Sequence, residues 1–129
     1  MSNDILTLVW FKRDLRVLDH APLSDAAEIG RVLPVYVIEP EVIEAADFDA
    51  LHWDFIRESL IDLNTSLEKL GVSLFIRLGE VCDVFQRLHQ QFGFTQIFAH
   101  EETGNALSYC RDRRLARWAK SAGVTFKET

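Results

Sequence analysis

Five short segments of the chain are almost continuously apolar and rich in β-prone residues. They span residues 5–11, 32–38, 72–78, 96–99 and 124–126. Apolar runs without alternation are typical of strands that helices cover on both faces of a sheet. The pattern therefore predicts five strands in a sheet with two buried faces.

Segments with helical periodicity lie between these runs. A short helix is predicted over about residues 22–29, because Pro22 suits a first helical turn and Asp19 or a neighbour can cap it. Three longer segments carry apolar residues at steps of three and four, which places them on one face of a helix. The three stripes are Ile56, Leu60, Leu63, Leu67 and Leu70; Val81, Val84, Phe85, Leu88 and Phe92; and Leu107, Arg111, Leu115, Trp118 and Ala122.

Four glycines mark the turns from helix back to strand. Gly30, Gly71, Gly93 and Gly123 each follow a helical stripe and precede an apolar run, a position where helices often end in a left-handed residue. Strands and helices therefore alternate along the chain, and right-handed crossovers give a parallel sheet between two layers of helices. The acidic, Ala-rich segment 40–49 is predicted as the one long connection.

Length and composition agree with one folded domain. The chain has 129 residues, of which 48% are hydrophobic and 26% charged, which excludes a disordered tail or a collagen-like repeat. With 14 Lys and Arg against 20 Asp and Glu, the formal charge is −6, the wrong sign for a chain whose whole surface binds nucleic-acid phosphate. No run approaches the roughly 20 apolar residues of a membrane span. We expect a cytoplasmic protein without a membrane partner, in which Cys82 and Cys110 are reduced thiols and not zinc ligands.

Polar residues gather where the predicted strands end. In open α/β sheets ligands bind at the carboxyl ends of the strands, near the point where the strand order reverses. The usual phosphate-binding glycine motifs, GxGxxG and GxxxxGK[ST], are absent, which argues against a nicotinamide dehydrogenase or a P-loop nucleotidase. The residues at these strand ends include Lys12, Arg13, Asp14, Glu39, Glu41, Gly79, Glu80, His100, Glu101 and Glu102.

The segment 8–23, Leu-Val-Trp-Phe-Lys-Arg-Asp-Leu-Arg-Val-Leu-Asp-His-Ala-Pro-Leu, resembles the opening signature of the DNA photolyase and cryptochrome family. Leu33-Pro-Val-Tyr-Val-Ile-Glu-Pro40 is similar to the second strand of that family, and residues 57–63, 70–71 and 111–112 are similar to its later helices. Pattern and resemblance together predict a three-layer Rossmann-like α/β fold. Its five-stranded parallel sheet has the order 3-2-1-4-5, with helices on both faces.

Three positions depart from the family signature. Lys12 replaces the usual Arg, His20 stands where Asn is common, and Ala21-Pro22 inverts Pro-Ala. In folate-binding members an Asn-Glu pair shortly before the Arg-Asp pair helps to hold the pterin, whereas residues 108–110 are Ser-Tyr-Cys here. The identity of a bound pigment is therefore left open among deazaflavin, flavin and folate.

The resemblance implies that residues 1–129 form the N-terminal, light-harvesting domain of a longer flavoprotein. The FAD-binding helical domain of the family would then be a separate partner, absent from this chain. The parent protein would repair pyrimidine dimers in damaged DNA with blue light, and the isolated domain would not catalyse repair. The alternatives are a cryptochrome photosensor without repair activity, or a stand-alone nucleotide-binding module.

Six residues are candidate pigment contacts, and each has a structural alternative. Strand-end residues of this kind can also brace the sheet or face solvent, and acids and amides near residue 104 can cap the following helix. Asp14 and Arg16 are interpreted as structural, and His100 as a histidine satisfied within the fold. The six candidates are Lys12, Arg13, Glu39, Glu101, Glu102 and Asn105.

Basic and aromatic residues elsewhere are interpreted as structural. Arg111, Arg113, Arg114, Arg117 and Lys120 spread over much of a helix surface with Asp112 among them, which favours a solvated or domain-contacting face over a DNA contact. Trp10, Trp53 and Trp118 lie in apolar stretches and are predicted to be core residues, although Trp53 can instead face a partner domain.

Overall fold

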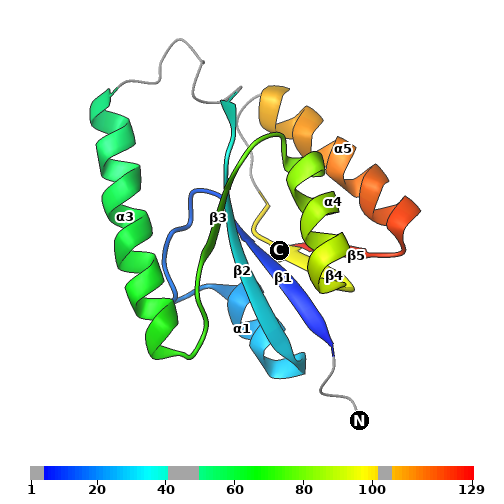
Figure 1. Cartoon of the computed structure of the whole chain (residues 1–129), viewed down its shortest axis with the longest axis horizontal. Helices are drawn as coiled ribbons and strands as arrows, with labels where there is room; N and C mark the ends of the chain where they lie inside the picture. Colours follow the sequence, from blue (N-terminus) through cyan, green and yellow to red (C-terminus); the bar gives the residue numbers. More distant parts are fainter. Residues whose placement is uncertain (1–4, 41–49, 102–105) are drawn as a thin grey trace.

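A computed structural model of the chain describes residues 5–40, 50–101 and 106–129. Five strands form one sheet in the order β3-β2-β1-β4-β5, and all four neighbouring pairs are parallel (Figure 1). The predicted fold class and strand order are therefore confirmed. The strands are β1 (Leu6–Phe11), β2 (Arg31–Ile38), β3 (Phe75–Leu78), β4 (Gln96–Ala99) and β5 (Thr125–Glu128).

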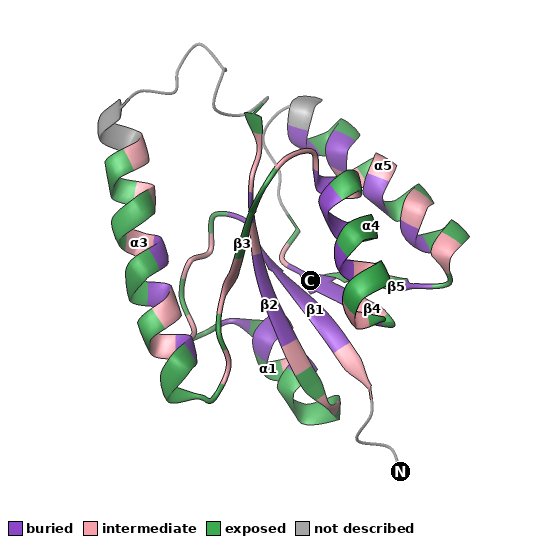
Figure 2. Cartoon of the chain, viewed as in Figure 1, coloured by how far each residue is buried: buried purple, intermediate pink, exposed green. Residues whose placement is uncertain are grey.

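Helices cover both faces of the sheet, which explains why the strand segments are apolar without alternation. Leu8 and Trp10 of β1 point to the face covered by α4 (Val81–Phe92) and α5 (Ala106–Ala122). Val9 and Phe11 point to the opposite face, against α1 (Ala21–Ile29) and α3 (Ala50–Lys69). Figure 2 shows β1 and β2 buried between these two layers.

Three element boundaries differ from the predicted ones for reasons that the contacts show, and the others agree to within one residue. The third strand begins at Phe75, because the preceding loop is held by the Asn64 side chain, whose Oδ1 accepts a hydrogen bond from the Leu74 backbone N–H at 3.0 Å. The fifth strand is Thr125–Glu128, two residues longer at its end than expected. Helix α3 ends at Lys69, and Leu70, which was placed on its apolar stripe, is 64% exposed.

Gly30 is needed for a different reason from the one predicted. Gly71, Gly93 and Gly123 have the expected positive φ, but Gly30 has an extended backbone with φ 167°. A Cβ at this position would lie 2.3 Å from the carbonyl oxygen of Ile5. The close approach of the chain entering β1, and not a left-handed turn, excludes a side chain here.

In the part of the chain that the structure describes, no helix is long and apolar enough to span a membrane. Cys82 and Cys110 are free thiols, the first half-buried and the second exposed.

Candidate functional site

The carboxyl ends of β1, β2, β4 and β5 bring together residues that lie far apart in the sequence. We call this group the carboxyl edge; it comprises the described residues Lys12, Arg13, Asp14, Glu39, His100, Glu101, Glu128 and Thr129 with Arg111 and Asp112 of α5. The strand order reverses between β1 and β4. The crevice at such a reversal is the usual ligand position in sheets of this type.

Lys12 lies at the centre of the carboxyl edge and is held by two acids. Its Nζ is 3.1 Å from Asp112 Oδ2 and 3.1 Å from Glu128 Oε2, and its side chain is 3% exposed. Burial raises the pKa of Glu128, and the neighbouring ammonium of Lys12 only partly opposes that rise. The ammonium of Lys12 therefore compensates acids from α5 and β5 inside the domain.

Arg111 forms a second link across the carboxyl edge. Its Nη1 donates to Glu39 Oε2 at 2.8 Å and its Nε to Asp112 Oδ1 at 3.0 Å. Arg111 and Lys12 both lie over the buried ring of Trp10, with Cζ and Nζ 4.8 Å and 4.4 Å from its centroid. Arg111 was expected on a solvated or domain-contacting helix face. A solvated position is wrong, because the side chain is 7% exposed and is drawn inward by an acid at the end of β2 and by a buried indole.

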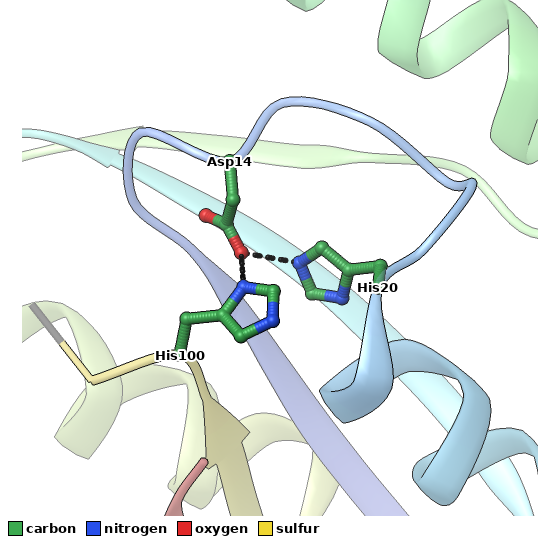
Figure 3. A group of neighbouring side chains, drawn as sticks. All are labelled: Asp14, His20 and His100. Carbon is green, nitrogen blue, oxygen red and sulfur yellow. Dashed lines mark hydrogen bonds and ion pairs between the residues drawn. The ribbon is translucent and has the colours of Figure 1, made fainter.

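Asp14, His20 and His100 form a partly buried polar cluster beside Lys12 and its two acids. Figure 3 shows both imidazole rings pointing at one carboxylate oxygen of Asp14. Oδ2 of Asp14 is 2.5 Å from Nδ1 of His100 and also contacts Nε2 of His20, while Oδ1 accepts the backbone N–H of Lys12 at 2.9 Å. The cluster joins the loop after β1, the start of α1 and the end of β4.

The tautomer of His20 follows from its second contact. His20 is the N-cap of α1, and its Nδ1 accepts the backbone N–H of Leu23 at 3.1 Å. A nitrogen that accepts a hydrogen bond carries no proton, so in the neutral ring the proton is on Nε2, facing Asp14. The short Nε2 contact is not aligned as a regular hydrogen bond, so its attraction is mainly electrostatic.

The same tautomer argues against a metal ion in this cluster. Donor atoms of Asp14, His20 and His100 all lie within 4.8 Å of one another, and two histidines with one carboxylate are a common metal-ligand set. A neutral imidazole that binds a metal through Nε2 carries its proton on Nδ1. At His20 that proton would face the Leu23 N–H, so these residues fit a hydrogen-bonded cluster better than a metal site.

Asp14 is ionised in this environment. Burial by itself raises the pKa of its carboxyl group, but this is outweighed by the contact with His20, the backbone N–H of Lys12, the charge on His20 when it is protonated, and the hydrogen bond to His100. The result is a pKa well below the ordinary value of 3.8. At neutral pH Asp14 can therefore only accept hydrogen bonds.

The structure places four of the six candidate pigment contacts. Lys12 and Glu39 lie at the carboxyl edge within ion pairs, with side chains 3% and 18% exposed. Arg13 and Glu101 are exposed at the same edge, and the backbone N–H of Glu101 donates to the carbonyl of Thr129 at 3.0 Å. Glu102 and Asn105 lie outside the described residues. A pigment-binding role remains a prediction for all six.

The structural interpretation of the loop after β1 agrees with the contacts. Asp14 closes its turn by accepting the Lys12 N–H, and Arg16 donates to the carbonyl oxygens of Leu18 and Asp19 at 3.1 Å each. Sequence reasoning missed the roles of His20, Asp112 and Glu128 at the site. For His20 there was a usable signal, because it directly precedes Ala21-Pro22 and stands where the family has Asn, a good helix cap.

The domain is a doubly wound α/β domain of the Rossmann-like type. Its parallel sheet has the order β3-β2-β1-β4-β5, helices cover both faces, and polar side chains gather where the strand order reverses. Within that class the comparison with known families is specific. Residues 7–129 match the family model described as DNA photolyase, and the chain belongs to that family.

Curated relatives agree with this assignment. The chain is 37% identical over 105 residues to the chloroplastic/mitochondrial cryptochrome DASH of Arabidopsis thaliana. The aligned region covers 76% of this chain and 18% of the relative. It is 34% identical over 116 residues to cryptochrome-2 of Gallus gallus, covering 89% of this chain and 20% of the relative. The chain thus spans about a fifth of the length of these relatives.

Solved structures share the same domain. An archaeal photolyase from Sulfolobus tokodaii superimposes with a TM-score of 0.87 at 28% sequence identity. The match covers 96% of this chain and 29% of the photolyase chain. That structure is described as containing two FAD molecules, with the implication of a novel light-harvesting cofactor. A class III photolyase from Agrobacterium tumefaciens gives a TM-score of 0.86 at 26% identity, covering 96% of this chain and 25% of that one.

Proposed function

We propose that this chain is the light-harvesting domain of a longer photolyase-like flavoprotein, and that the whole protein repairs pyrimidine dimers in DNA with blue light. In this proposal a pigment binds at the carboxyl edge, and FAD binds in a separate helical domain that contacts damaged DNA. The observation that carries the proposal is the family match over residues 7–129, together with polar groups gathered at the reversal of strand order. We also propose a cytoplasmic location, which the two free thiols support.

The acidic character of the chain supports this division of roles. Its net charge of −6 is unsuited to tracking the DNA backbone, so contact with DNA would belong to another part of the protein. The pigment can be a deazaflavin, a flavin or a folate. The archaeal neighbour described with two FAD molecules makes a flavin the first probe to use.

Pigment binding by the isolated chain tests the proposal. The chain is titrated with FMN, with 8-hydroxy-5-deazaflavin and with 5,10-methenyltetrahydrofolate, and binding is followed by absorption and fluorescence. We expect one of the three to bind, and Glu101→Ala and Glu102→Ala to lower its occupancy without changing the circular dichroism spectrum. If occupancy is unchanged in both variants, these acids cap the following helix and do not contact the pigment.

A repair assay separates the role of the domain from that of the whole protein. With reduced FAD, a dimer-containing oligonucleotide and blue light, the isolated chain should give no dimer reversal, because in this proposal the catalytic FAD binds in the separate helical domain. Reversal by the isolated chain would contradict the proposed division of roles. A longer protein that carries this domain should give light-dependent reversal.

A cryptochrome photosensor without repair activity is the second candidate. It is favoured by the curated relatives, which are named cryptochromes. The same assay on the longer protein distinguishes the two, because a photosensor would show flavin photoreduction without dimer reversal. Family membership removes the reason for considering a stand-alone nucleotide-binding module, and tight binding of ATP or AMP by the isolated chain would restore it.

A further inference from the structure

We propose that His100 is a pigment-contacting residue whose Nε2 accepts a hydrogen bond from a ring N–H of the pigment, with Asp14 as the positioning residue that sets its tautomer. This inference rests on the proposed function, because it concerns the same carboxyl edge. It goes further because it names the protein atom that accepts a hydrogen bond and the chemical group of the ligand that donates it.

The proton of His100 is placed by Asp14. An ionised carboxylate only accepts, so the 2.5 Å contact between Asp14 Oδ2 and His100 Nδ1 requires the proton to be on Nδ1. In the neutral ring Nε2 then has a free lone pair and acts as an acceptor. By holding the proton on Nδ1, the Asp14 carboxylate leaves Nε2 of the neutral ring as a hydrogen-bond acceptor.

The carboxylate itself cannot easily turn away from His100. Its Oδ1 accepts the Lys12 N–H at 2.9 Å, and its Oδ2 also contacts His20, which is fixed as the N-cap of α1 by the Leu23 N–H. The His20 ring is 1% exposed and lies against the His100 ring, with centroids 4.5 Å apart. The loop after β1 and the start of α1 therefore hold Asp14, and through it His100, in one orientation.

Nε2 of His100 is available at the expected ligand position. Among the hydrogen bonds of the described residues, none uses this nitrogen. The side chain is 26% exposed, in contrast to that of His20, and it follows β4 directly beside β1, where the strand order reverses. Within the described residues, His100 is thus a polar group at the crevice whose Nε2 makes no hydrogen bond.

The charges around His100 select the kind of ligand group that it can meet. Lys12 and Arg111 are already paired with acids, and across the carboxyl edge acidic side chains outnumber basic ones. An anionic ligand group such as phosphate is disfavoured in such a field, whereas an N–H donor is not. Flavin, deazaflavin and pterin rings all carry an N–H at position 3, beside a ring carbonyl, and this is the donor we assign to Nε2.

The test combines a change in the protein with a change in the ligand. The pigment that binds in the titration above is compared with its N3-methyl derivative on the wild-type chain and on His100→Leu, His100→Gln and the control His89→Gln. His89 is a suitable control because it lies on α4, where its ring packs against Phe94 and Trp118 and does not reach the carboxyl edge. Circular dichroism and thermal melting verify that each variant is folded.

We expect His100→Leu to weaken binding about three- to tenfold, the range for one neutral hydrogen bond. N3-methylation should weaken wild-type binding to a similar degree and have little further effect on His100→Leu. His100→Gln should retain part of the affinity, because its amide oxygen can accept the same bond, and His89→Gln should bind like the wild type.

Two results would overturn the inference, and they differ in what they say of the proposed function. If a pigment binds wild type and His100→Leu equally, or if N3-methylation weakens both equally, His100 is not the acceptor, while the light-harvesting role stands. If none of the three pigments binds the folded wild-type chain, the proposed function fails and the inference fails with it.

Discussion

His20 shows how one side chain takes the place of another by matching its hydrogen-bonding groups. The related family signature commonly has Asn at this position, and Asn offers one acceptor and one donor. With its proton on Nε2, His20 offers the same pair: Nδ1 accepts the Leu23 N–H and Nε2–H faces Asp14. The substitution therefore keeps both the helix cap and the contact to the carboxylate.

This equivalence predicts a clear order of stability among variants of His20. His20→Ala should lower the free energy of unfolding by about 2 kcal/mol, because it removes a cap and leaves a buried cavity. His20→Asn should lose less than half of that. Urea denaturation followed by circular dichroism measures both, and equal losses in the two variants would show that packing of the ring, and not its hydrogen bonds, matters here.

Lys12 illustrates why a compact cation suits its position. The ammonium lies 3.1 Å from one acid on α5 and 3.1 Å from another on β5, so it has to donate in two directions. A planar guanidinium, which is usual in the family signature, favours both oxygens of one carboxylate. Lys12 is thus adapted to join two acids from different elements.

Removing the Lys12 ammonium should lower the stability of the fold, by an amount that depends on pH. Lys12→Met leaves Glu128 without its cation and Asp112 with Arg111 alone, and at pH 7 the free energy of unfolding should fall by about 3 kcal/mol. The pKa of Glu128 is already raised, chiefly by burial, and rises further without Lys12. As pH falls and Glu128 takes up a proton, the loss of stability caused by Lys12→Met should shrink.

Urea titrations of Lys12→Met at pH 7 and at pH 4.5 measure this effect. A second substitution, Glu128→Gln, should recover part of the loss at pH 7 because it removes one unpaired charge. An equal loss at both pH values, with no recovery in the double variant, would assign the cost to the lost contact between the Lys12 ammonium and the Trp10 ring.

Among the elements, α4 shows how a cap affects chemistry as well as stability. Glu80 is its N-cap, and its carboxylate accepts the backbone N–H groups of Cys82 at 3.0 Å and Asp83 at 3.3 Å. Negative charge is favourable at this end of a helix. The same charge lies next to the Cys82 thiol, where it disfavours the thiolate.

Cys82 should therefore be much less reactive than its accessibility suggests. Burial, and after it the charge of Glu80, raise the pKa of Cys82 to about 11. At pH 8 about one thiol in a thousand is then ionised, and only the thiolate reacts rapidly with iodoacetamide. Peptide mass spectrometry should show that the exposed Cys110 is alkylated first.

Glu80→Gln provides the control for this prediction. It removes the charge beside Cys82 but keeps a side chain of the same size, so alkylation of Cys82 should become faster while that of Cys110 stays constant. If Cys82 in the wild-type chain reacts as fast as Cys110, the opening of α4 and not the thiol pKa controls the reaction.

For the whole molecule, the carboxyl edge is a network that ties the sheet to its helices. Arg111 links α5 to the end of β2, Lys12 links β1 to α5 and β5, and Asp14 links the loop after β1 to α1 and β4. These contacts depend on ionised carboxylates. The stability of the domain should therefore depend on pH in the acid range.

Asp14 sets the direction of that dependence. Its pKa in the folded chain is lower than in the unfolded chain, so its contribution to stability is complete above the unfolded value of about 4 and is lost as pH falls below it. Asp14→Asn should cost about 2 kcal/mol at pH 7, the range for hydrogen bonds to a charged group. The cost should be smaller at pH 3.

Urea titrations of wild type and Asp14→Asn between pH 7 and pH 3 measure this difference. Far-UV circular dichroism at each pH verifies that both proteins start from the folded state. A difference in the free energy of unfolding that stays constant over this range would mean that the charge of Asp14 is not what stabilises the cluster.

The fold was predictable because its signals repeat along the chain. Five apolar runs alternate with helical stripes. Because strands and helices alternate regularly, the assignment of one segment supports the assignment of the segments on either side. The site was predictable only in its location. Lys12 and Glu39 were correctly placed at the carboxyl edge, but their partners were not, since Lys12 and Glu128 are 116 positions apart and Arg111 and Glu39 are 72 apart.

The sequence by itself determined the class of fold, the order of its elements and the family, because hydrophobic periodicity and a contiguous motif are local properties of the chain. Tertiary structure decided which charges meet. The spacing of Arg111 put it on the apolar stripe of its helix, but only the approach of β2 to α5 gave it Glu39 as a partner. His100 likewise obtained its tautomer from Asp14, 86 positions away. The 14 basic and 20 acidic residues of the sequence could form many different pairs, and the geometry of the sheet edge selects a few of them.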